Sequence, residues 1–244
     1  MCGRYAATAD PTALIEEFGV AEPPKEELPP DYNVAPTKKV YLVLDRVVDD
    51  VPIRTLTCGR WGLVPSWAKD PSIGSRMINA RAETVAEKPA YRKSFAKRRC
   101  LLPADGYYEW YLPTNPDAAV GKGGKPIKQP FFIRPADGAS LAMAGLYEWW
   151  RDPTREDDDP AAWRLTCTVI TTESSDELGR IHDRMPMTVA KAGWDRWLDP
   201  SGFDPASLLL PAAAAGLEAF PVSTLVNNVR NNGPELLQPI AAGE

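Results

Sequence analysis

Proline recurs throughout this chain and limits how far any helix or strand can run. The sequence holds 25 prolines in 244 residues, whereas an average protein contains about 5% proline. Proline has no backbone N–H donor and a fixed φ angle, so it ends or bends regular elements. Because the prolines are dispersed, they predict many short elements joined by firm turns and not a disordered linker.

Strand-forming residues dominate the stretches between the prolines. Runs rich in β-branched and aromatic residues, bounded by turn formers, are typical of strands. We expect strands at 40–44, 53–61, 100–102, 107–112, 131–134, 141–150 and 165–172.

Helices are fewer. Asp10 caps a first helix that ends at Gly19, and Thr84 with Glu87 forms a capping box for a second. Tyr91 and Phe95 are four residues apart and should face the core together. Segments 175–181 and 192–198 also look helical. The pattern predicts an α+β fold of one domain over 1–244, mainly antiparallel, with surface loops inserted at 115–129 and 152–161.

Composition restricts the class of protein. The chain shows no signal peptide and no apolar run of about 18 residues, so we expect a soluble cytoplasmic protein. Four separated cysteines and one histidine favour neither disulfides nor a metal site, and we expect no cofactor. A net charge of −5 argues against bulk nucleic-acid coating, so any DNA site must be a local basic patch, such as 91–99.

Cys2 is the first candidate for chemistry. Once Met1 is removed, Cys2 carries a thiol and an α-amine on adjacent carbons. An α-amine has a pKa of about 7.7–8.0, so a useful fraction is neutral near pH 7 and can attack an aldehyde. The thiol can then close a five-membered thiazolidine ring. The alternative is that Cys2 is an incidental small residue at a frayed terminus.

Other candidates lie in short polar motifs. His182, the only histidine, stands between Ile181 and Asp183 and is either an acid–base group or an ordinary surface residue. Asn79 can orient an amine and a carbonyl at once. Trp67 is surrounded by turn residues and either stacks on a base or packs in the core.

Two glutamates occupy similar contexts. Glu109 lies in GYYEW at 106–110 and Glu148 lies in GLYEW at 145–149. A repeated strand pattern accounts for both, so the pattern alone does not rank the two carboxylates as candidate acids.

Taken together, these motifs resemble the SOS response-associated peptidase (SRAP) family. The matches run in order along nearly the whole chain: MCGRY at 1–5, YNVAPT at 32–37, WGLVP at 61–65, NARAET at 79–84, PADGYYEW at 103–110, HDRMP at 182–186 and a late run at 221–229. The loops at 115–129 and 152–161 belong to none of these motifs.

The resemblance implies a curved, barrel-like β-core flanked by helices and covalent capture of abasic sites in single-stranded DNA. We expect a monomer, since nothing in the sequence demands more. It implies Cys2 as the crosslinking nucleophile, Asn79 as its positioning residue, Glu109 as the proton shuttle, and His182 as the group that helps to open the deoxyribose. It implies DNA contacts from Arg4, Arg81 and Arg184, with Asn33 and Thr171 as weaker candidates, and Trp67 and Pro36 as walls of the site. It also implies cysteine peptidase activity, aimed at the chain's own N-terminal residue, and lyase-like Schiff-base chemistry.

Two other functions use the same residues. An N-terminal-nucleophile amidase would use Cys2 against a peptide carbonyl, without needing Trp67 or the three arginines. A non-covalent DNA-binding module would not need Cys2 at all.

Overall fold

The computed structural model describes residues 2–240 apart from 115–119, 122, 125, 157, 175, 202–204 and 210–215. Met1 and seven of the 15 residues of the predicted loop at 115–129 therefore lie outside the described residues. No helix within the described ranges is long and apolar enough to cross a membrane.

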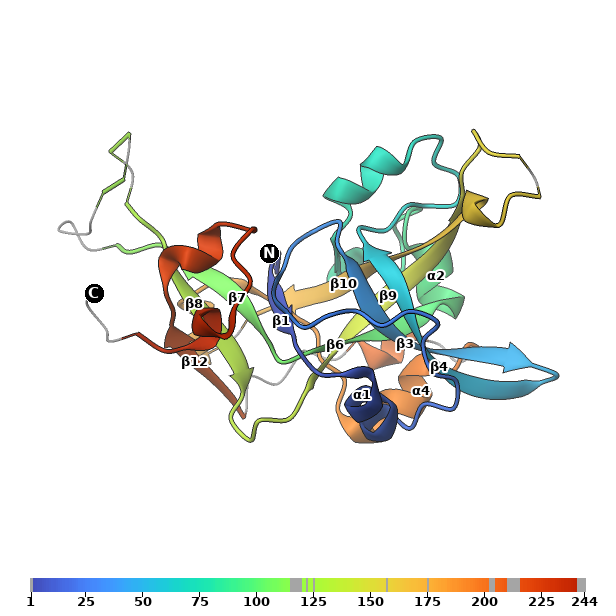
Figure 1. Ribbon diagram of the computed structural model, residues 1–244, viewed down its shortest axis with the longest axis horizontal. Coiled ribbons are helices and arrows are strands. Elements are labelled where there is room, and N and C mark those ends of the chain that lie inside the picture. The colour runs from blue at the N-terminus through green and yellow to red at the C-terminus, as the bar shows by residue number, and fades with distance from the viewer. Residues whose placement is uncertain are drawn as a thin grey trace.

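Five strands close into a barrel, which forms the right-hand part of Figure 1. Each strand pairs with two neighbours in the ring order β4-β3-β6-β9-β10, and β10 returns to β4. The pairings are antiparallel except for the short parallel contact between β4 and β10. The strands are β3 (Lys39–Val48), β4 (Val51–Trp61), β6 (Arg99–Ala104), β9 (Leu141–Arg151) and β10 (Trp163–Glu173).

Two short strands extend the barrel wall along the second half of β10. β5 (Asn79–Arg81) runs parallel to it, with Asn79 opposite Val169. β11 (Arg184–Pro186) runs antiparallel to it, with Arg184 opposite Glu173. Both carry residues from the predicted site, so β10 sets where those residues lie.

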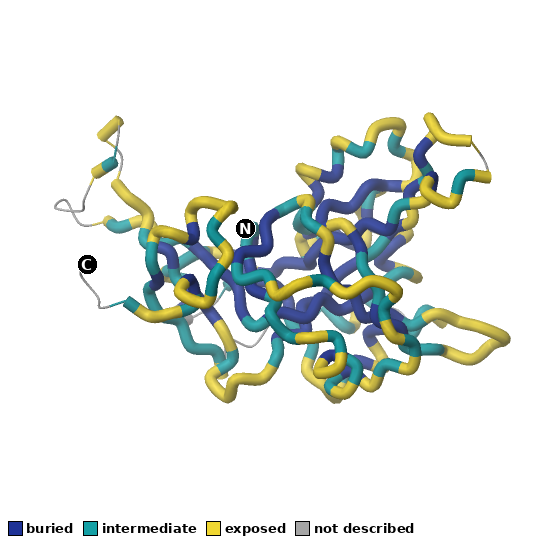
Figure 2. Tube along the Cα trace, in the orientation of Figure 1, coloured by how far each residue is buried: buried dark blue, intermediate teal, exposed yellow. Residues whose placement is uncertain are grey.

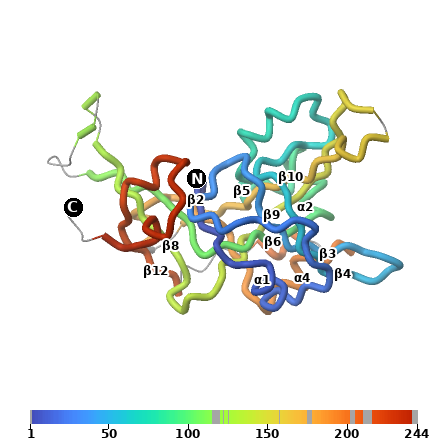
Figure 3. The backbone as a smooth tube through the Cα atoms, in the orientation of Figure 1, coloured from blue at the N-terminus to red at the C-terminus, as the bar shows by residue number. Residues whose placement is uncertain are grey.

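A second antiparallel sheet stands beside the barrel and contains the beginning of the chain. Its order is β12-β8-β7-β1-β2, and β1 lies near the middle of the molecule in Figures 1 and 3. These strands are β1 (Tyr5–Ala7), β2 (Asp31–Val34), β7 (Gly106–Tyr111), β8 (Gln129–Pro135) and β12 (Leu217–Pro221). The α+β fold with a barrel-like, mainly antiparallel core is therefore confirmed.

The helices are short and lie outside the strands. α1 (Pro11–Phe18) begins at the predicted Asp10 cap and ends at Gly19, which adopts the left-handed conformation. The others are α2 (Arg92–Lys97), α3 (Asp176–Gly179) and α4 (Trp194–Leu198), with 3-10 turns at Pro71–Arg76, Ala82–Thr84, Pro160–Ala162, Lys191–Gly193, Pro205–Leu208, Thr224–Asn227 and Pro234–Leu237.

The predicted capping box at Thr84 is wrong. Thr84 ends a 3-10 turn, and its carbonyl accepts from the backbone N–H groups of Glu87 and Lys88. The α-helix starts only after Tyr91. Pro89 explains the delay, because proline supplies no N–H to the ladder and disfavours helical geometry at the residue before it.

Apolar side chains fill both faces of the barrel wall. Leu42, Leu102 and Cys167 point into one cluster inside the barrel. Val43, Tyr91 and Phe95 belong to a second cluster outside it, which α1, α2 and α4 cover. The two predicted core partners, Tyr91 and Phe95, are both buried as expected. Figure 2 shows the barrel strands as largely buried and the loop tips as exposed.

The acidic segment at 152–161 connects β9 to β10 as a loop, apart from residue 157, which is not described. Asp152 anchors the loop: its carboxylate is buried and pairs with Arg164 at 2.6 Å. The acidic charge of the loop is therefore partly neutralised by an arginine of β10.

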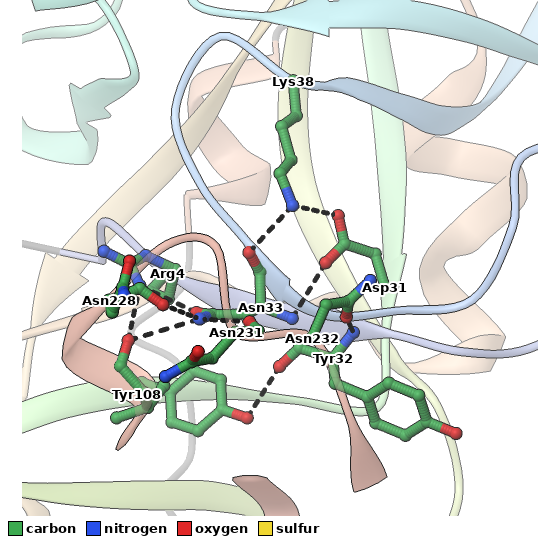
Figure 4. Close-up of polar contacts among 10 residues, drawn as sticks. Arg4, Asp31, Tyr32, Asn33, Lys38, Tyr108, Asn228, Asn231 and Asn232 are labelled. Atoms are coloured by element: carbon green, nitrogen blue, oxygen red, sulfur yellow. Dashed lines mark hydrogen bonds and ion pairs between the residues drawn. The ribbon is translucent and has the colours of Figure 1, made fainter. Parts of the chain in front are cut away.

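Asn33 ties the C-terminal segment to β2 (Figure 4). Its side chain is fully buried; Oδ1 accepts from Arg4 Nη1 at 2.7 Å. Its Nδ2 lies within hydrogen-bond distance of the carbonyl oxygens of Val226, Asn228 and Asn231. One side-chain amide thus provides hydrogen bonds to carbonyl oxygens that are not paired within a helix or a sheet.

A second layer of contacts surrounds this amide. Lys38 Nζ pairs with Asp31 at 2.6 Å and donates to the Asn33 carbonyl. The Tyr32 N–H donates to Asn232 Oδ1. The C-terminal segment is therefore fixed to β2 by several bonds, of which the one from Asn33 to Val226 is buried and the others are partly buried or exposed.

We expect Asn33→Ala to lower the free energy of unfolding by about 2–4 kcal/mol, because it strands several buried polar groups at once. Asn232→Ala is the matched control: it removes one exposed hydrogen bond and should cost less than about 1 kcal/mol. Urea denaturation of both variants measures the difference. Equal midpoints for the two variants would contradict the role given to Asn33.

Candidate active site

Cys2 lies three residues before the start of β1 and is fully buried, although it is almost at the end of the chain. Its carbonyl oxygen accepts from Asn79 Nδ2 at 2.8 Å. Its side chain belongs to the apolar cluster inside the barrel. Burial, followed by the charge of Glu109, raises the pKa of the Cys2 thiol well above its usual range. The thiol is therefore protonated at neutral pH.

Asn79 is held from two sides. β5 fixes its backbone against β10, and Tyr91 Oη donates to its carbonyl oxygen at 3.1 Å. With Nδ2 bonded to Cys2, its Oδ1 is buried and has no hydrogen-bond partner among the residues the structure describes. An unused acceptor beside Cys2 suits a group that arrives or is uncovered later, such as an amine.

Glu109 reaches the same place from β7. Tyr5 pairs with Tyr107, so continuing that register brings Glu109 opposite Gly3 and next to Cys2. The Glu109 side chain is 3% exposed. Burial is the main cause that raises its pKa to about 7, so both its protonated and ionised forms are populated at neutral pH.

Glu148 is a different kind of carboxylate. It accepts from Arg98 Nη2 at 2.7 Å and from Ser94 Oγ at 3.3 Å, on the side of the barrel covered by α2. A carboxylate engaged in an ion pair is poorly suited to a proton shuttle. The geometry separates two glutamates that the sequence pattern left equivalent.

His182 faces Glu109 from the segment before β11. The distance between His182 Nε2 and Glu109 Oε2 is 3.9 Å, too long for a direct hydrogen bond. His182 Nδ1 lies 3.0 Å from the Arg184 N–H and 2.9 Å from the exposed carboxylate of Asp183. Burial lowers the pKa of His182, which favours the neutral ring. In that ring Nδ1 accepts from Arg184, and Nε2 carries the proton toward Glu109.

The three arginines predicted to contact DNA differ in their environment. Arg81, on β5, is exposed. Arg184 is buried; it forms a two-pronged pair with Glu83 at 2.7 and 3.1 Å and donates to the Thr171 carbonyl at 2.6 Å. Arg4 donates to Asn33 and stacks over Trp110 at 5.7 Å. In both Arg4 and Arg184, Nε is buried without a partner in the described structure.

The remaining predicted residues lie in two settings. Thr171 on β10 and Asn33 on β2 are buried, with 1% and 0% exposure. Trp67 is 61% exposed in the turn that follows β4, and Pro36 is half-buried just before the tight turn at Thr37. The structure thus brings Cys2, Asn79, Glu109 and His182 together, keeps Thr171 and Asn33 inside, and leaves Trp67 facing solvent.

Sequence reasoning missed two supporting residues. Glu83 orients Arg184, and Tyr91 holds the backbone of Asn79. Glu83 lies inside the 79–84 motif, so the sequence already offered a carboxylate that could form an ion pair with an arginine of the site. Tyr91 gave only a packing signal, since nothing in its spacing indicated the bond to Asn79.

Comparison with known proteins agrees with the motifs. The family model described as SOS response associated peptidase (SRAP) matches residues 1–229. The chain belongs to this family.

Relatives of this family member span nearly its whole length. It is 39% identical to the Abasic site processing protein YoqW of Bacillus subtilis, covering 98% of this chain and 99% of that one. It is 32% identical to the Abasic site processing protein HMCES of Xenopus tropicalis, covering 98% and 78%. A crystal structure of a Bacteroides thetaiotaomicron protein superposes with a TM-score of 0.78 at 25% identity, covering 98% and 100%.

The described residues contain no group of three or more histidine, cysteine, aspartate or glutamate side chains placed to hold a metal ion.

The raised pKa of Glu109 predicts a pH-dependent stability. A buried carboxyl whose pKa rises from an ordinary 4.5 to about 7 stabilises the fold when protonated, and this contribution is lost as pH rises between those values. Glu109→Gln removes the loss, so relative to the parent it should gain up to roughly 3 kcal/mol between pH 5 and pH 8. Urea denaturation at both pH values measures this.

Glu148→Gln is the control for that experiment. It breaks the ion pair with Arg98 and should destabilise the protein at pH 8. If the difference in stability between Glu109→Gln and the parent were the same at pH 5 and pH 8, the assignment of the titration to Glu109 would be contradicted.

Proposed function

We propose that this protein captures abasic sites in single-stranded DNA by forming a covalent bond through Cys2. The observation that carries the proposal is the burial of Cys2 against Asn79 at the meeting point of Glu109 and His182. The relatives at 39% and 32% identity, which bear the name abasic site processing protein, support abasic sites as the target.

The reaction begins after Met1 is removed. The free amine of Cys2 attacks the aldehyde carbon of the opened deoxyribose and gives a carbinolamine, which loses water to form a Schiff base. The Cys2 sulfur then adds to the imine carbon and closes the thiazolidine ring. Because burial keeps the thiol protonated, the amine is the first nucleophile and the sulfur the second.

Glu109 suits both proton transfers. With a pKa of about 7, its protonated form can donate to the departing hydroxyl, and the resulting carboxylate can accept the thiol proton when the ring closes. The same group running in reverse would reopen the ring. A permanently ionised carboxylate would serve only one of these steps.

His182 acts on the sugar. Its neutral ring points Nε2–H toward Glu109, and the 3.9 Å between Nε2 and Oε2 allows a sugar oxygen that lies to one side of the two atoms to bond to both. Donation to the ring oxygen favours the open aldehyde, which is the only form that the amine attacks.

DNA binding uses groups around this centre. Arg81 is exposed, and the guanidinium groups of Arg4 and Arg184 are held in place by Asn33 and Glu83; these three arginines would bind phosphates near the lesion. Thr171 supports Arg184 through its carbonyl, and Asn33 supports Arg4 through its amide. Trp67 and Pro36 would limit base stacking at the lesion. Single strands are favoured because an extrahelical sugar costs less there.

The peptidase activity in the family's description is consistent with cleavage of a single bond, the one between Met1 and Cys2. Removal of Met1 exposes the amine on which the reaction depends, and self-cleavage at the Met1–Cys2 bond would supply it. We place this activity in the chain's own maturation and not on external peptides, since an exposed Trp67 has no role with a peptide substrate.

The direct test mixes the purified protein with single-stranded DNA carrying one abasic site, followed by a denaturing gel and intact mass measurement. We expect a heat-stable adduct whose mass equals protein lacking Met1 plus DNA minus one water. Cys2→Ala and Cys2→Ser should form no such adduct, and undamaged DNA should give none with any variant. Absence of the adduct from protein confirmed to lack Met1 would refute the proposed function.

Trp67 provides a second test. A stacking contact with a base contributes about 1–3 kcal/mol, so Trp67→Ala should slow capture at sub-saturating DNA by about tenfold or more. Trp163, the first residue of β10, is 51% exposed and is the matched control. Trp163→Ala should stay within twofold of the parent. If both variants capture DNA at the parent rate, Trp67 does not contact the DNA.

A further inference from the structure

Tyr107 carries a buried hydroxyl that the proposed reaction has not yet used. The residue is 1% exposed, and Oη has no hydrogen-bond partner among the described residues. A buried hydroxyl without a partner costs free energy, because it loses its bonds to water and gains none. A group kept at such a cost is suited to a partner that forms only during the reaction.

The strand geometry directs Tyr107 toward the site. Successive side chains of a strand point to opposite faces, so Tyr107 and Glu109 share one face of β7. Tyr107 lies opposite Tyr5 of β1 and belongs to the same buried cluster as Cys2. Its neighbour Tyr108 points the other way, into a separate cluster, and donates to the Tyr32 carbonyl at 2.8 Å.

The electrostatics agree with this placement. Burial raises the pKa of Tyr107 well above its usual range, and the charges of Cys2 and Glu109 raise it further. The phenol therefore remains a proton-bearing donor throughout the working pH range. It shares a buried cluster with the Cys2 thiol, whose own pKa burial has raised, so the sulfur is the atom in this site that most needs a donor.

We propose that the Tyr107 hydroxyl donates a hydrogen bond to the Cys2 sulfur as the thiazolidine ring closes. This inference rests on the proposed function and adds a residue to its second step. In that step the sulfur–carbon bond forms, the π electrons of the protonated C=N bond return to nitrogen, and the thiol proton passes to the Glu109 carboxylate. Tyr107 stabilises the negative charge that develops on sulfur and keeps its own proton.

Schiff-base formation does not involve the sulfur, so Tyr107 should affect only the ring closure. The two steps can be followed separately in one reaction. Borohydride reduction traps the Schiff base, whereas the unreduced, heat-stable adduct reports the closed ring.

The experiment compares the parent, Tyr107→Phe and Tyr108→Phe on single-stranded abasic DNA, with Cys2→Ala as the inactive reference. We expect Tyr107→Phe to form the borohydride-trapped adduct at the parent rate and the heat-stable adduct about tenfold more slowly, as for loss of a hydrogen bond to a charged group. Its slow step should recover as pH rises. Tyr108→Phe should match the parent in both rates.

Stability measurements exclude a structural explanation. Tyr107→Phe removes an unpartnered hydroxyl and should leave the urea midpoint unchanged or higher, whereas Tyr108→Phe removes a formed hydrogen bond and should lower it. Heat-stable adduct forming at the parent rate in Tyr107→Phe would overturn the assignment while leaving the proposed function intact. Equal slowing of both steps would overturn it as well. No adduct in the parent would overturn the proposed function itself.

Discussion

Seven residue pairs, from Trp163 with Arg151 to Val169 with Gly145, join β9 to β10 and close the barrel. These pairs engage the first part of β10 and leave its second part to other strands. β5 takes the edge from Val169 to Thr171, and β11 takes the edge from Thr171 to Glu173. The ladder that closes the core thus also decides where Asn79 and Arg184 lie. A change of register in it would move both relative to Cys2.

Burial affects the Cys2 thiol and the Glu109 carboxyl in different ways. The first residues of a chain are usually frayed, yet Cys2 lies in the core because Asn79 bonds its carbonyl and β1 pairs with β7. The same burial keeps the thiol protonated and brings Glu109 to a pKa of about 7. Exclusion of water therefore keeps the thiol protonated, so that the sulfur reacts second, and keeps part of Glu109 protonated at neutral pH, so that it can act as an acid. The order of the proposed steps, amine before sulfur, follows from one physical cause.

The long strands were predictable because their residues are buried on one or both faces of the barrel, which selects for β-branched and aromatic side chains. β1, β2, β5, β11 and β12 were not predicted. They have three to five residues each, and all but β11 pair with strands that are distant in sequence, so tertiary contacts define them. The capping box at Thr84 failed for a related reason: a local signal was overridden by Pro89. For the site, the motifs supplied residue identities, but only the fold shows that Glu148 is held by Arg98 while Glu109 faces His182.

Preorganisation explains how a chain with a net charge of −5 can bind a polyanion under the proposed function. Arg184 is fixed by Glu83 and the Thr171 carbonyl, and Arg4 by Asn33 and Trp110. Such guanidinium groups lose little side-chain entropy when a phosphate arrives. Their internal partners also reduce the long-range attraction that a free basic patch would exert on undamaged strands. Affinity then depends on a few fixed contacts beside the lesion, and selectivity on the aldehyde, which an intact nucleoside does not present to Cys2.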